Sequence, residues 1–212
     1  MTQLIPGQTV PDLELPLTID ARFELSKQQP EAFTMLVFYR GKHCPICKKY
    51  LTELSGKLDQ FTDKGINVFA VSMDSPERAA VSHEEWDTGD VPLAHSLSED
   101  KAREWGLYIS EKRDGSEEPD MFSEPGLFLI KPDGTLHFAV VQNAPFTRPD
   151  LDDLAAVVFQ LGVVSHQKVV GRKTPRAHQR CRPVGVMHQR GWIEQESSFF
   201  VGFTHGCASR GG

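Results

Sequence analysis

The 212-residue sequence contains only four cysteines, too few for a disulfide framework at this length. Cys181 and Cys207 each stand alone, and no second C-x-x-C motif supplies the four ligands of a closed zinc site. Cys44 and Cys47 form the one close pair. This pair indicates redox chemistry, with a structural zinc site and an inactive pair as the weaker alternatives.

Long hydrophobic runs and a targeting signal are also missing. No stretch approaches the roughly 18 apolar residues that a membrane-spanning helix needs. The first residues, MTQLIPGQ, contain neither the basic region nor the apolar region of a secretory signal. We therefore expect a cytoplasmic protein that does not contact a membrane.

The excess of negative charge belongs to only one part of the chain. Residues 1–164 contain 15 Lys and Arg against 27 Asp and Glu, a formal charge of −12, whereas residues 165–212 contain 8 against 2, a charge of +6. Apolar periodicity also ends near Leu161 and Gly162. We predict a folded domain over residues 1–164 and a basic tail over 165–212 that is disordered or atypical. A nucleic-acid contact by this tail is not favoured, because it lacks a binding motif.

Apolar patterns in the first part predict alternating strands and helices. The expected strands are Thr34–Tyr39, Ile66–Ser72, Leu127–Ile130 and Leu136–Val141, and the expected helices are about Pro45–Lys64 and Pro149–Leu161. The first strand, helix and second strand form a right-handed βαβ unit. Asp133-Gly134 predicts a hairpin turn between the last two strands. This order is typical of an α/β, thioredoxin-like fold, in which helices flank a central mixed sheet.

Cys44 precedes the first predicted helix, which makes it the candidate nucleophile. The thiolate is the reactive form, and a free cysteine is mostly protonated at neutral pH. Unpaired N–H groups at a helix start favour a negative charge. Cys47 follows one helical turn later, within reach to resolve a sulfenic acid or a mixed disulfide at Cys44. The nearby basic side chains are Arg40, Lys42, His43, Lys48 and Lys49.

Two of these basic residues are candidate site residues. For His43 we expect an effect of its charge more than acid–base catalysis, because C-x-x-C chemistry does not require a proton donor. Packing beside the helix is the alternative for this side chain. Arg40 ends a buried strand beside the nucleophile, and it is either a functional cation or a surface charge.

The segment from Phe38 to Leu51, FYRGKHCPICKKYL, resembles the peroxiredoxin-like branch of the alkyl hydroperoxide reductase/thiol-specific antioxidant (AhpC/TSA) family. The resemblance extends over about residues 5–161. Its supporting segments are Gly7–Leu13, which resembles the N-terminal β-hairpin of the family, Val71–Glu77, Leu97–Gly106 and the Gly126–Thr135 hairpin.

The resemblance implies a thiol-dependent antioxidant oxidoreductase that reduces peroxides through Cys44, with Cys47 as the resolving cysteine. The expected partners are the substrate and an external thiol donor, such as a thioredoxin or glutathione system. A homodimer is left open, and no cofactor or metal is expected.

Several positions depart from the family pattern. Typical members have a threonine three residues before the reactive cysteine and a proline seven before it, where this sequence has Gly41 and Val37. Pro125 replaces an arginine and corresponds to the cis-proline of thioredoxin-like disulfide reductases, so we expect Pro125, Gly41 and Pro45 to shape a substrate groove. Arg40 is the candidate to replace the missing arginine.

These departures leave three functions open. Peroxide reduction is favoured by the family resemblance, and protein disulfide reduction is the close alternative. A non-catalytic redox-sensing or binding domain is the third, in which the dithiol oxidises without turning over. Turnover with a thiol donor separates the enzymes from the sensor.

Truncation near Ser165 is expected to leave both the melting temperature and the redox turnover unchanged. The tail lacks the apolar periodicity of a helix or strand that would pack on the core. Thermal unfolding and activity of the full-length and truncated chains test this expectation. A loss of several degrees would show that the tail packs on the domain and that the predicted boundary is wrong.

Overall fold

The computed structural model describes residues 4–161. The predicted basic tail, with Cys181 and Cys207, lies outside the described residues. Between residues 4 and 161, none of the helices combines the length and the apolar character that crossing a membrane requires.

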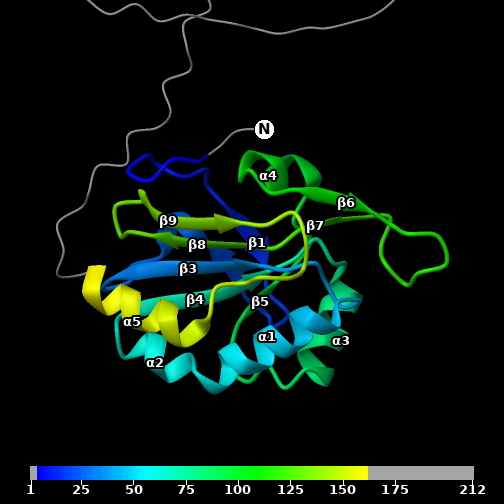
Figure 1. Ribbon diagram of the computed structural model, residues 1–212, viewed down its shortest axis with the longest axis horizontal. Helices are drawn as coiled ribbons and strands as arrows, with labels where there is room; N and C mark the ends of the chain where they lie inside the picture. Colours follow the sequence, from blue (N-terminus) through cyan, green and yellow to red (C-terminus); the bar gives the residue numbers. More distant parts are fainter. Residues whose placement is uncertain (1–3, 162–212) are drawn as a thin grey trace, which may run out of the picture. The chain divides into compact units, whose positions relative to one another are not determined.

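A five-stranded mixed sheet with strand order β5-β4-β3-β8-β9 forms the centre of this region (Figure 1). The strands are β3 (Phe33–Phe38), β4 (Ile66–Val71), β5 (Leu93–Ala94), β8 (Gly126–Ile130) and β9 (Leu136–Val141). Strand β3 pairs in parallel with β4 and antiparallel with β8, and all six of its residues are buried. This burial agrees with its continuous apolar sequence, because a central strand has both faces covered.

Helices cover one face of the sheet and a mixture of elements covers the other (Figure 1). On the first face, Met35 and Val37 of β3 share a core with Leu51 and Leu54 of the helix that follows the dithiol. On the second face, Leu36, Phe38 and Trp105 belong to a separate core. The side chains of β3 alternate between the two cores because successive residues of a strand point to opposite faces.

The remaining elements are β1 (Glu14–Pro16), β2 (Arg22–Glu24), η1 (Leu25–Lys27), α1 (Pro45–Gly56), α2 (Leu58–Thr62), α3 (Pro76–Glu85), α4 (Glu99–Glu104), β6 (Ile109–Glu111), β7 (Met121–Ser123) and α5 (Leu151–Leu161).

The expected helix over Pro45–Lys64 is divided into α1 and α2, so this part of the prediction is wrong. Lys57 leaves the helical conformation, with φ −115° and ψ 8°, and its N–H bonds to the Leu54 carbonyl at 3.1 Å. Gly56 precedes the break, and glycine lowers helix stability because it is conformationally free. The second helix ends at Thr62, two residues before the expected end at Lys64. Gly65 follows with a φ of +71°, a left-handed value that favours glycine.

Other boundaries differ from the prediction by one or two residues. The strand expected at Thr34–Tyr39 begins and ends one residue earlier, as β3. Helix α5 begins at Leu151 instead of Pro149, because the Asp150 carboxylate caps it and accepts the Asp152 N–H at 2.9 Å. The hairpin turn is confirmed, with Gly134 at φ +77°.

The N-terminal hairpin is present, but it lies after the segment that suggested it. Residues 7–13 connect to the β8–β9 hairpin, where the Gly7 N–H bonds to the Leu136 carbonyl at 2.7 Å. The hairpin itself is β1 paired with β2. Short elements such as α3, α4 and β5 to β7 were not predicted, because they are too brief to show a clear period.

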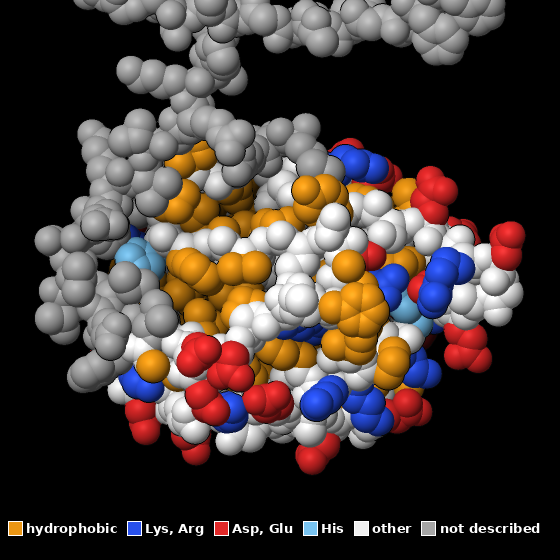
Figure 2. Space-filling view, viewed as in Figure 1, with side chains coloured by type: hydrophobic (Ala, Val, Ile, Leu, Met, Phe, Trp, Pro, Cys, Tyr) orange, Lys and Arg blue, Asp and Glu red, His pale blue; other side chains and the backbone are white. Residues whose placement is uncertain are grey.

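Side chains of different kinds gather in different parts of the face shown in Figure 2. Hydrophobic side chains lie over the β8 and β9 side of the sheet, and charged side chains lie mainly along the lower and right-hand margins (Figure 2). The large hydrophobic side chain with the greatest exposure in the described chain is Phe146, at 61%. It belongs to the connection between β9 and α5.

Candidate active site

The two cysteines lie at the start of α1. Cys44 is the N-cap residue, and Pro45 follows at the first helical position, where the N–H that proline lacks would have no partner within the helix. The Cys44 Sγ atom accepts a hydrogen bond from the Cys47 backbone N–H, with 3.3 Å between nitrogen and sulfur. Both thiols are free, and Cys44 and Cys47 are only 1% and 0% exposed.

The two thiols have opposite pKa shifts. Hydrogen bonds from the Cys47 side chain and backbone lower the pKa of Cys44 to about 6, and the charges of Arg148 and Arg40 also lower it, against the effect of burial. Burial raises the pKa of Cys47 well above its usual range, and the hydrogen bond to Cys44 raises it further. At neutral pH the pair therefore holds a thiolate at Cys44 beside a protonated thiol at Cys47.

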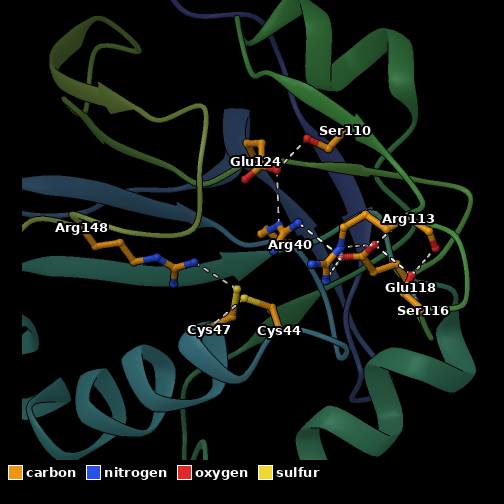
Figure 3. Close-up of polar contacts among 9 residues, drawn as sticks. All are labelled: Arg40, Cys44, Cys47, Ser110, Arg113, Ser116, Glu118, Glu124 and Arg148. Carbon is orange, nitrogen blue, oxygen red and sulfur yellow. Dashed lines mark hydrogen bonds and ion pairs between the residues drawn. The ribbon is translucent and has the colours of Figure 1, made fainter.

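Arg148 reaches the dithiol from the connection between β9 and α5 (Figure 3). Its Nη2 atom lies 3.0 Å from the Cys47 sulfur, and its guanidinium carbon lies 5.2 Å from the centroid of the Tyr50 ring. The Nε and Nη1 atoms of Arg148 are buried and have no hydrogen-bond partner among the described residues. Two buried donors beside the dithiol thus have no acceptor within residues 4–161.

Sequence reasoning missed Arg148. It lies 101 residues after Cys47, in a segment that has no helix or strand pattern. The one local signal is its position directly before Pro149 and the capping Asp150, which places it at the entry to a helix. That signal does not identify what the side chain contacts.

Arg40 points to a cluster of buried carboxylates instead of the sulfurs (Figure 3). Its Nε atom lies 3.3 Å from a Glu124 oxygen, and its Nη2 atom lies 3.5 Å from a Glu118 oxygen. The two carboxylates are 3% exposed, so each needs a cation or hydrogen-bond donors close by. The expectation that Arg40 replaces the missing arginine is therefore corrected: it contributes a distant positive charge to Cys44, and its polar contacts are with glutamates.

Other donors complete the same cluster. Arg113 donates from Nε to Glu118 at 3.1 Å, Ser116 donates to Glu118 at 2.9 Å, and Ser110 donates to Glu124 at 2.6 Å. The hydrogen bond from Arg113 is the main reason that the pKa of Glu118 falls to about 2. Glu118 is therefore ionised at neutral pH and keeps Arg40 in its place.

His43 is uncharged at neutral pH. Burial, followed by the positive charge of Arg40, lowers the pKa of His43 to about 4. Its ring lies 4.6 Å from the Phe122 ring, centroid to centroid, and neither ring nitrogen has a hydrogen-bond partner among the described residues. The predicted charge effect of His43 on Cys44 is therefore wrong, and a direct catalytic role stays a prediction.

Gly41 is required by the backbone and by Asp74. Its φ is +119°, and a Cβ atom at this position would lie 2.6 Å from the Asp74 Oδ1 atom. The same carboxylate accepts the Lys42 N–H at 2.7 Å and a hydrogen bond from Arg78 Nε at 3.0 Å. Asp74, which sequence reasoning missed as a site residue, thus fixes the loop before Cys44. A threonine at position 41 would collide with it.

The three predicted groove residues do not come together. Pro125 lines a small cleft with Tyr50, Gly126 and Arg148, but neither Gly41 nor Pro45 lines that cleft, and Pro45 is exposed. No peptide bond in the described chain is cis, so Pro125 differs from the cis-proline of disulfide reductases. The expectation of a groove shaped by all three residues is corrected on this point.

Among residues 4–161, no group of three or more His, Cys, Asp or Glu side chains is arranged to hold a metal ion. The chemistry that this arrangement supports is that of a buried thiolate with an adjacent thiol and an arginine.

Solved peroxiredoxin structures share this fold. Peroxidoxin BcpB from Mycobacterium tuberculosis matches with a TM-score of 0.61 at 21% identity, covering 75% of this chain and 98% of that one. A cysteine-to-serine variant of peroxiredoxin 6 from Arenicola marina matches with a TM-score of 0.64 at 19% identity, covering 84% and 80%. The thioredoxin-like fold, with its mixed sheet between flanking elements, is confirmed.

Sequence comparisons agree with the structural ones. The protein named "Putative peroxiredoxin YkuU" from Bacillus subtilis is 25% identical over 177 residues, which cover 76% of this chain and 91% of that protein. The family model described as "AhpC/TSA family" matches residues 6–139, more than half of the 212-residue chain. This chain therefore belongs to the AhpC/TSA family.

Proposed function

We propose that the protein is a thiol peroxidase that reduces peroxides through a dithiol–disulfide cycle of Cys44 and Cys47. Membership of the AhpC/TSA family, with peroxiredoxins among its relatives, supports peroxidase activity. The observation that supports the finer proposal is the hydrogen bond from the Cys47 N–H to the Cys44 sulfur at 3.3 Å, together with the opposite pKa shifts of the two thiols. In this proposal the nucleophile and its resolving group are one helical turn apart.

The cycle has three balanced steps. The Cys44 thiolate attacks one oxygen of the peroxide, the O–O bond breaks, and the leaving alkoxide or hydroxide takes up a proton, which leaves a sulfenic acid at Cys44. The Cys47 thiol then attacks that sulfur, so that the Cys44–Cys47 disulfide forms and water leaves. Two equivalents of an external thiol donor return both cysteines to the reduced state and become a disulfide themselves.

Arg148 is the donor best placed to support the first step. Charge develops on the leaving oxygen as the O–O bond breaks, and donors that are already in position stabilise this charge without reorganisation. Gly41 supplies no hydroxyl, and Arg40 is held by two glutamates. The Nε and Nη1 atoms of Arg148 have no acceptor among the described residues and are the N–H groups best placed for this charge. We assign this role to Arg148 as part of the proposal.

Burial of the dithiol favours a small oxidant over a protein disulfide. A disulfide reductase needs a thiolate that a protein substrate can reach, whereas Cys44 is 1% exposed and Cys47 is 0% exposed. Disulfide reduction therefore remains the second candidate. The third candidate, a sensor without turnover, is separated from both by a steady-state assay with a thiol donor and hydrogen peroxide.

The two cysteines are expected to behave differently when each is replaced. Cys44→Ser should abolish reaction with peroxide, because it removes the thiolate. Cys47→Ser should still react once and then accumulate a sulfenic acid or a mixed disulfide with the donor, because its resolving thiol is missing. Intact mass after one equivalent of peroxide measures both outcomes, and retained first-step reactivity in Cys44→Ser alone would reverse the assigned roles.

The reactivity of Cys44 is expected to follow a titration with a midpoint near pH 6. The pKa of Cys44 is lowered to about 6, so the thiolate fraction and the alkylation rate should rise between about pH 5 and 7 and level off above that range. The rate of reaction with iodoacetamide in Cys47→Ser and wild type, measured from pH 4 to 9, tests this. A midpoint in wild type near the ordinary cysteine value of about 8.5 contradicts the proposed thiolate.

Arg148 is expected to matter more than Arg40 for the peroxide reaction. Arg148→Gln should slow single-turnover oxidation of Cys44 by hydrogen peroxide on the order of 10²–10³-fold, the usual cost of losing one oxyanion donor. Arg40→Lys keeps a cation between Glu118 and Glu124 and should slow the reaction far less. The exposed Arg103→Gln, on α4, is the matched control and should react as the wild type does.

The same measurements decide between peroxide and disulfide reduction. A neutral model disulfide develops no charge on oxygen, so Arg148→Gln should slow that reaction much less than the peroxide reaction. If wild type reduces insulin disulfides readily while Cys44 reacts with hydrogen peroxide no faster than free cysteine thiolate, the protein is a disulfide reductase and the proposed function is wrong.

A further inference from the structure

A second cavity lies at the end of β3 that is remote from the dithiol. Thr34, near the start of this strand, lines the cavity, whereas Cys44 follows the other end of the strand. The cavity has a volume of about 240 Å³. One water needs only roughly 10–15 Å³, so the space is large enough for a small organic molecule. A cavity of this size, separate from the reactive cysteines, is a candidate ligand site.

Three segments enclose this cavity beside β3: residues 9–10, the η1 turn with the residues around it, and the turn between β8 and β9. The Val10 N–H bonds to the Gly134 carbonyl at 3.1 Å, and the Leu25 N–H bonds to the Leu13 carbonyl at 2.9 Å. These backbone hydrogen bonds fasten the walls to one another without any ligand. The cavity is therefore preformed, as most small-molecule sites are.

The inner wall of the cavity is apolar except for one hydroxyl. Val10, Leu25 and Ile130 line it and are buried. Thr34 is only 2% exposed, and its hydroxyl has no hydrogen-bond partner within residues 4–161. A buried hydroxyl without a partner is unfavourable, so this group is suited to bond a ligand. The wall thus offers contact with a hydrocarbon group and one polar position.

Two opposite charges line the same cavity from the β8–β9 turn. They belong to Lys131, which is half-buried, and Asp133, which is exposed. Hydrogen bonds from Thr135, followed by the positive charge of Lys131, lower the pKa of Asp133, so its carboxylate is ionised at neutral pH. No ion pair joins Lys131 to Asp133 in the part of the chain that the structure describes. A cation and an anion therefore border one cavity without neutralising each other directly.

We propose that this cavity binds a free α-amino acid with an apolar side chain. Lys131 pairs with the ligand's carboxylate, and Asp133 accepts hydrogen bonds from its ammonium group. The Thr34 hydroxyl donates to the carboxylate, and the hydrocarbon side chain packs on the apolar wall. The inference does not depend on the peroxidase cycle, because no residue of the dithiol site takes part.

The presence of both charges is what selects this class of ligand. A simple carboxylic acid would pair with Lys131 and leave its own negative charge beside Asp133. A simple amine would pair with Asp133 and bring a second positive charge beside Lys131. Only a ligand with both groups pairs each charge of the site, and a zwitterionic amino acid holds them on adjacent atoms.

Three ligands of the same hydrocarbon shape test the proposal. L-Leucine, 4-methylpentanoate, which lacks the ammonium group, and 3-methylbutylamine, which lacks the carboxylate, are titrated into the full-length reduced protein by calorimetry at low ionic strength. Leucine should bind at least about tenfold more tightly than either analogue, the change that one charge-assisted hydrogen bond corresponds to. Absence of leucine binding at millimolar concentrations, or equal affinity for leucine and one of the analogues, overturns the proposal.

Variants locate the binding. Lys131→Met and Asp133→Asn should each weaken leucine binding about tenfold, and the asparagine keeps an oxygen for the hydrogen bonds from Thr135. Thr34→Val keeps the shape of the buried side chain and should weaken binding about fivefold, the effect of one neutral hydrogen bond. Lys112→Met, at an exposed position between β6 and β7, is the matched control and should bind as the wild type does. Wild-type affinity in both Lys131→Met and Asp133→Asn, with unchanged melting temperatures, overturns the site.

A last measurement separates this site from the dithiol. Saturating leucine should leave the rate of Cys44 alkylation by iodoacetamide unchanged, because the cavity lies at the other end of β3. Protection of Cys44 by leucine would place the ligand at the dithiol and overturn the proposal. Failure of peroxide to oxidise Cys44 would overturn the peroxidase function alone, since the leucine titrations use the reduced protein.

Discussion

The sulfur of Cys44 occupies the place of a capping oxygen at the start of α1, where it accepts the Cys47 N–H at 3.3 Å. This contact holds the proposed nucleophile at the helix start and orients the first turn of the helix. Together with the hydrogen bond from the Cys47 side chain, it lowers the pKa of Cys44. It also brings the second thiol to the same point, since Cys47 follows in the first turn. The separation into a thiolate and a thiol follows from the contact together with the deeper burial of Cys47.

Positive charge near the dithiol is divided between two arginines with different tasks. Arg40 joins Glu118 and Glu124, two carboxylates that are too deeply buried to remain ionised without cations and donors. It therefore ties the end of β3 to the β6–β7 hairpin and the segment beside it. Arg148 has no carboxylate partner among residues 4–161, and within that range its side chain donates to the Cys47 sulfur. Within residues 4–161, Arg148 has two side-chain donors, Nε and Nη1, without a hydrogen-bond acceptor, and it lies against the dithiol itself.

The loop before Cys44 explains why the site lacks the hydroxyl that its family resemblance implies. Asp74 holds the Lys42 N–H and occupies the space that a side chain at position 41 would need. With Gly41 in a left-handed conformation, this loop is built around a carboxylate and not around a hydroxyl donor. In the proposed mechanism, Arg148 supplies the N–H donors that Gly41 and Arg40 do not provide.

Short-range patterns in the sequence determined much of the fold and the position of the dithiol. Apolar periods predicted β3, β4, β8, β9 and α5 within one or two residues, and the strand-to-helix junction identified Cys44 as the nucleophile to propose, since capping and turn formation act over a few residues. The division of α1 from α2, the neutral state of His43, and the partners of Arg40 and Arg148 were decided only by the tertiary structure. Arg148 and Cys47 are 101 residues apart, and Arg40 and Glu118 are 78 apart. Burial and charge pairing over such separations arise when the sheet brings distant segments together, and no local pattern records them.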